Sequence, residues 1–168
     1  MSMRQETLHI LGVSEDELVK MLIRDVRAVF NNMVGIEDLL HLPLQIDVIS
    51  NFQDCVTGMV GLAGAFNGLV SIHVPTQLAL SFTSTMLDME VNEINQDVND
   101  ALGEIANMIA GCFKHHFSGG GSDIRISIPS VVYGADYTFF CGSAASENIT
   151  LKFATDEEWF MVSITLEE

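Results

Sequence analysis

The order of helical and strand-like segments is the feature that most limits how this chain can fold. An amphipathic helix pattern spans residues 14–34, and a second one runs from about residue 93 to 117. Strand-like segments follow each of these patterns along the chain. Because the same order occurs twice, the sequence predicts an internal duplication whose halves cover about residues 14–87 and 93–168.

Local signals place the ends of the predicted helices. Ser14 is a predicted N-cap with Glu17 at the capping-box position, and Gly35 is a typical residue to end the first long helix. A shorter helix is predicted over residues 76–87, directly after Pro75.

Strands are predicted where apolar and polar residues alternate with a period of two. Asn67-Gly68 is a strong signal for a two-residue hairpin turn, and residues 156–158 form a second predicted turn. Hairpin connections favour antiparallel pairing, so we expect an α+β fold with one central antiparallel sheet and the two long helices packed on one face. Each pseudo-twofold repeat would contain a long helix and about three strands. The predicted strands cover residues 44–49, 57–66, 69–74, 124–128, 149–153 and 159–166.

Composition and charge narrow the classes of function. The chain has 168 residues, of which 48% are hydrophobic, and this size favours a single domain over residues 1–168. A net charge of −16 argues against binding to nucleic acid. No apolar run approaches the ~18 residues of a membrane span, and the first residues lack the apolar region of a signal peptide. We therefore expect a cytoplasmic protein that does not enter the membrane.

The cysteines give no indication of a metal site. Cys55, Cys112 and Cys141 lie far apart, and none of their spacings suits zinc or a redox pair. We expect them to be buried thiols in a reducing compartment, and we predict no metal ligands in this chain.

The second long helix carries an unusual polar face. Asp100, Glu104 and Asn107 occupy positions i, i+4 and i+7, and they therefore line one side of the helix. Asp97 lies close to them, one turn before Asp100. Residues 28–113 contain no Lys or Arg, so these carboxylates have no basic neighbour in the sequence.

The residue pattern alone leaves three interpretations of this polar face open: an ordinary solvated surface, a site for Mg²⁺ or Ca²⁺, or a functional surface. One helix face rarely supplies enough converging ligands for such a cation. Like charges at i and i+4 destabilise a helix, and Glu104 lies too far along the helix to gain much from its dipole. The position of Glu104 therefore has no local stability rationale.

The predicted duplication provides a comparison for the polar face. The two long helices can be aligned so that Asp25, Val29 and Asn32 lie opposite Asp100, Glu104 and Asn107. In this alignment the first copy keeps half of the pattern and lacks the glutamate.

The pattern Asp100-x-x-x-Glu104-x-x-Asn107 on a long helix resembles the signature of the CheC/CheX/FliY family of chemotaxis phosphatases. Among these the chain most resembles CheX-type members, which keep only the second of two active helices, as Val29 suggests here. The resemblance covers most of the chain. It includes residues 33–35, 61–64, 67–68, 76–87 and 129–134.

This resemblance implies an enzyme that removes the phosphoryl group from the aspartyl phosphate of a CheY-like response regulator in two-component signalling. The catalytic pair of the family falls on Glu104 and Asn107. Asn107 would orient the attacking water, and Glu104 would dock on the lysine of the receiver domain. The expected contacts with the partner are Asp97, Asp100, Gly103 and Gly111.

The resemblance also implies a homodimer, and it implies that the chain itself binds no cofactor because the receiver carries the Mg²⁺. Two alternatives use the same fold. One is a module that binds a receiver or another protein without catalysis. The other is a structural dimer in which the polar helix face is only solvated.

Overall fold

The computed structural model describes residues 3–43, 51–143 and 145–167. Helices and strands alternate as the sequence predicts, with short additions at the N-terminus and before β4. The elements are α1 (Gln5–Leu11), α2 (Glu15–Val34), β1 (Leu40–Leu42), β2 (Asn51–Gly64), β3 (Asn67–Pro75), α3 (Thr76–Leu87), α4 (Gln96–Lys114), the 3-10 helix η1 (Ser118–Gly121), β4 (Ile124–Ile126), β5 (Ser130–Thr138), β6 (Glu147–Ala154) and β7 (Trp159–Glu167).

Within the described residues, the strands form one seven-stranded antiparallel sheet in the order β1-β6-β7-β3-β2-β4, with β5 also paired to β2. At its centre β3 pairs with β7, and Val70 lies opposite Ile164. The two sides of this pair are arranged alike. β1 comes after α2 and pairs with β6, and β5 comes after α4, η1 and β4 and pairs with β2. The predicted pseudo-twofold α+β fold is confirmed.

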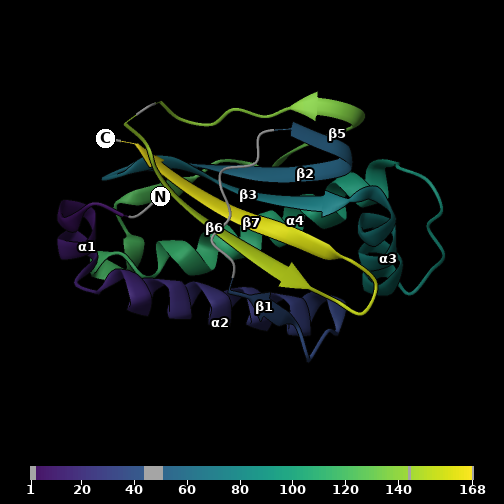
Figure 1. Ribbon diagram of the computed structural model, residues 1–168, viewed down its shortest axis with the longest axis horizontal. Coiled ribbons are helices and arrows are strands. Elements are labelled where there is room, and N and C mark those ends of the chain that lie inside the picture. The colour runs from purple at the N-terminus through teal and green to yellow at the C-terminus, as the bar shows by residue number, and fades with distance from the viewer. Residues whose placement is uncertain (1–2, 44–50, 144, 168) are drawn as a thin grey trace.

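Both long helices cover the same face of the sheet (Figure 1), as the sequence predicts. The apolar stripe of α4 includes Leu102, Ile105 and Phe113, each fully buried. Between the helices and the sheet, Phe30 stacks on Phe160 with ring centroids 4.7 Å apart. Burying side chains of this size contributes roughly 1.5–3 kcal/mol each. This packing fixes which side of α4 faces the solvent.

The predicted ends of α2 agree with the structure, whereas those of α4 do not. Ser14 and Glu17 form a reciprocal capping box, and Gly35 ends α2 in the left-handed conformation with φ 73°. Asn95 caps α4 by accepting from the Val98 backbone N–H at 3.2 Å. α4 is therefore a few residues shorter at each end than the predicted segment 93–117.

Several strand predictions need correction. Asn67-Gly68 is not the hairpin turn, because both residues lie in β3 and Gly68 pairs with Leu62. The turn lies between Gly64 and Asn67, where Gly64 adopts φ 138° and a Cβ would meet the Asp123 carbonyl oxygen at 2.0 Å. The elements α1, β1 and β5 were not predicted. The expected strand over residues 44–49 lies outside the described residues.

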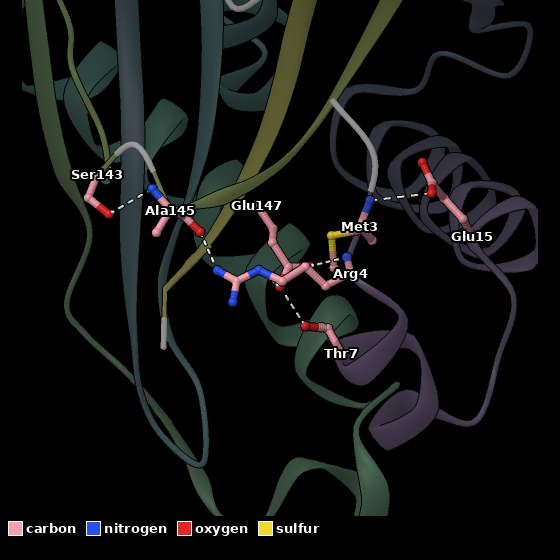
Figure 2. A network of polar contacts seen from close by, with 7 residues as sticks. All are labelled: Met3, Arg4, Thr7, Glu15, Ser143, Ala145 and Glu147. Carbon is pink, nitrogen blue, oxygen red and sulfur yellow. Dashed lines mark hydrogen bonds and ion pairs between the residues drawn. The ribbon is translucent and has the colours of Figure 1, made fainter.

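A polar network holds α1 against the start of β6 (Figure 2). The buried carboxylate of Glu147 accepts from the Thr7 hydroxyl at 2.7 Å and from the Arg4 backbone N–H at 2.8 Å. The Arg4 side chain adds an ion pair, with 3.3 Å between its Nε and Glu147 Oε1. The N-terminal segment is thus joined to the sheet 140 residues away in sequence.

Candidate functional site

The polar face of α4 is open to solvent, as the sequence predicts. Asp97, Asp100 and Glu104 are exposed, and Asn107 is half-buried. The opposite face of the helix is fully packed against the sheet and α2. Because the opposite face of α4 is packed, Glu104 and Asn107 project outward from a helix that is held in place. The two side chains lie one turn apart.

The carboxylates on this face differ in their hydrogen bonding. Asp100 Oδ1 accepts from the Gln96 side-chain amide at 2.7 Å. Among the described residues, neither Glu104 nor Asn107 forms a hydrogen bond or an ion pair with another side chain. Their polar atoms are therefore available to an incoming molecule without loss of an internal contact.

The two glycines of the predicted partner surface have different surroundings. Gly103 is buried, and a Cβ at this position would lie 3.1 Å from Pro129 Cβ. Its small size lets the chain before β5 pack closely on α4. A Cβ on Gly111 would meet nothing within 4 Å, so Gly111 leaves open space beside the turn that carries Asn107.

A groove adjoins the acidic part of this face. It encloses about 500 Å³ between α4 and the start of β5, together with Pro129 just before that strand. Sequence reasoning missed its far wall, because Pro129 and Val131 lie about 25 residues from Glu104 along the chain and carry no polar motif. Met108, which is 42% exposed beside Asn107, was also missed. Residues that line the groove include Gln96, Asn99, Asp100, Glu104, Pro129 and Val131.

The comparison between the two long helices is wrong in one respect. Val29 is 3% exposed and belongs to the core, whereas Glu104 is exposed, so these positions are not equivalent on the surface. Asp25 does not present a free carboxylate either, because its Oδ2 contacts His116 Nε2. The proposed remnant of a first active face on α2 therefore does not match the face of α4.

Other candidate sites receive less support. In the part of the chain that the structure describes, no three His, Cys, Asp or Glu side chains are placed to hold a metal ion. The three cysteines are free and half-buried, and burial raises the pKa of each thiol. A larger cavity of about 750 Å³ near the start of α3 includes Phe52, His73 and Trp159, and its lining contains no residue of α4.

The helices of the described residues do not have the length and composition of a membrane span. Within those residues, none is both long enough and apolar enough to cross a bilayer.

Comparison with known proteins relates the chain to one family. Residues 56–153 match the family model described as chemotaxis phosphatase CheX. The CheY-P phosphatase CheX of Thermotoga maritima is 29% identical over 120 residues, which cover 71% of this chain and 77% of that protein.

Solved structures give the same relationship. A chemotaxis protein CheX from Desulfovibrio desulfuricans superposes with a TM-score of 0.75 at 29% identity, covering 90% of this chain and 99% of that one. The CheX of a CheX–CheY–BeF3–Mg²⁺ complex from Borrelia burgdorferi shares the fold, with a TM-score of 0.74 at 22% identity and coverage of 90% and 98%.

Proposed function

The chain belongs to the family of CheX chemotaxis phosphatases, and from this membership we propose that it hydrolyses the aspartyl phosphate of a CheY-like receiver domain. The observation that carries the proposal is the open face of α4, where Glu104 and Asn107 are accessible and have no partner among the described residues. The CheY-P phosphatase activity of the Thermotoga relative supports the choice of substrate.

Asn107 is the proposed catalytic residue. Its amide orients a water molecule in line with the bond between phosphorus and the aspartate oxygen of the receiver. The water oxygen bonds to phosphorus, the aspartate leaves as a carboxylate, and the water protons remain with phosphate and solvent. The receiver supplies Mg²⁺ to neutralise the developing charge, so this chain needs only to position the attacking water.

Glu104 is the proposed docking residue. Its carboxylate binds the lysine of the receiver through a charge-assisted hydrogen bond. Asp97 and Asp100 are exposed on the same side of α4, and their negative charges would attract the same lysine. Gly111, with open space above it, allows the receiver to approach close to Asn107.

We also propose a homodimer that forms through the free edge of β5. Within the described residues β5 pairs only with β2, so the backbone groups on its outer side are available to another strand. Val132 is 42% exposed and Tyr133 is 56% exposed along this edge. A second copy would extend the sheet and cover these side chains.

A phosphate-release assay tests the proposed activity. The purified protein is added to CheY of the same organism, phosphorylated with phosphoramidate in the presence of Mg²⁺, and inorganic phosphate is measured with time. We expect release to accelerate well beyond the intrinsic rate of the receiver. Binding of the phosphorylated receiver without acceleration would instead identify a non-catalytic module of the same fold.

A further inference from the structure

The groove beside α4 contains a buried polar atom that no other described residue satisfies. Asn99 Oδ1 is buried and is without a hydrogen-bond partner among the described residues. A buried acceptor in this state typically destabilises a protein, and few native groups remain so. Asn99 lines the groove next to Asp100. Because the terminal torsion of asparagine is broad, the amide can turn this oxygen toward a donor that enters the groove.

The two walls of the groove have different chemistry. The α4 wall carries Asp100 and Glu104, and no basic side chain lines the groove among the residues that the structure describes. The opposite wall carries Pro129 and Val131, which are apolar. A long basic side chain suits this combination, since its aliphatic stem packs on apolar surface while its head group donates to acceptors.

We propose that this groove receives a basic side chain of the receiver, one other than the lysine that docks on Glu104. Its head group donates to Asn99 Oδ1 and to the Asp100 carboxylate, and its stem lies against Pro129 and Val131. This assignment rests on the proposed function, because the groove shares Glu104 with the catalytic face. Asn99 is then a specificity-determining residue that sets which receivers bind well.

The test uses Asn99→Leu and Asn99→Asp in the full chain, with phosphoramidate-phosphorylated CheY as substrate. Leucine keeps the size of the side chain and removes the acceptor. We expect the KM of Asn99→Leu to rise about tenfold with little change in kcat, the effect of losing one hydrogen bond to a charged group. Aspartate adds a charge, so the KM of Asn99→Asp should fall and depend more steeply on salt. Asn31→Leu, at an exposed position on α2, is the matched control.

Thermal unfolding separates binding from folding. Removal of an unsatisfied buried acceptor should leave the Tm of Asn99→Leu unchanged or higher. An unchanged KM in both Asn99 variants would overturn the proposal, and so would a KM change shared by Asn31→Leu. If the wild-type protein does not accelerate phosphate release, the proposed function is wrong. Binding of phosphorylated CheY to the three variants then still tests the proposal about the groove.

Discussion

At the scale of single residues, the proposed chemistry depends on two side chains that have no partner in the part of the chain that the structure describes. Glu104 and Asn107 gain no internal partner among the described residues, although each lies one helical turn from other polar groups. His73 shows the opposite arrangement. It is 5% exposed, its Nδ1 is bonded to Thr57 Oγ1 at 2.8 Å and its Nε2 to Ser71 Oγ at 3.0 Å. His73 is thus buried with both ring nitrogens hydrogen-bonded, which is typical of a polar side chain with a structural role.

The buried imidazole predicts a pH dependence of stability. Burial lowers the pKa of His73 from 6.5 to about 4, so the folded state favours the neutral ring. Stability is therefore present above pH 6.5 and is lost as the pH falls toward 4. Urea unfolding at pH 7 and pH 4.5 should show that wild type loses roughly 2–3 kcal/mol more than His73→Gln. Equal losses in the two proteins would show that His73 is not held neutral.

At the scale of elements, the position of α4 depends on a glycine in the sheet beneath it. Gly58 lies in β2, and a Cβ there would come within 2.8 Å of the Leu102 carbonyl oxygen on α4. The absence of a side chain lets the helix approach the strand closely. This close contact fixes the distance between α4 and the sheet. The same distance sets how far the polar face of α4 projects.

Gly58→Ala should accordingly destabilise the protein. The clash involves backbone atoms of α4, which cannot move aside as a flexible side chain would, so we expect a loss of about 1–3 kcal/mol. Gly111→Ala is the matched control, because it adds a methyl group into open space and improves helix propensity by up to about 1 kcal/mol. Denaturant unfolding measures both changes, and equal stability of the two variants would refute this explanation of how α4 packs.

The helices α2, α3 and α4 and the central strands could be predicted from the sequence because their signals are local. The capping box at Ser14 and the apolar period of α4 need no knowledge of the fold. β5 was missed because Gly134 and Asp136 interrupt its alternation, and its strand conformation depends on pairing with β2. The groove could not be predicted either, since it needs Pro129 brought beside Gly103.

At the scale of the whole molecule, the outer side of β5 pairs with no other strand among the residues that the structure describes. The division into halves at about residues 14–87 and 93–168 stays a prediction. The register in which the two long helices were compared is wrong, because Val29 is buried whereas Glu104 is exposed. Burial on the folded protein decides which positions are equivalent, and sequence spacing alone does not. The homodimer and the cytoplasmic location stay predictions.

The free edge gives a prediction about assembly. Val132→Lys places a charge on β5, where an approaching strand would have to desolvate it. We expect sedimentation equilibrium to give twice the chain mass of 18.4 kDa for wild type and a single chain mass for the variant. A monomeric wild type would rule out the proposed dimer, and a variant that remains dimeric would place the interface elsewhere.

The central claim is that the face of α4 performs hydrolysis on a bound receiver. The most direct test compares Asn107→Ala with wild type in two assays, phosphate release from phosphorylated CheY and binding of the same receiver, with Asn31→Ala as the control. Loss of one preorganised catalytic group predicts release slower by roughly 10²–10³-fold, with binding retained. If Asn107→Ala released phosphate as fast as wild type, the claim would be contradicted.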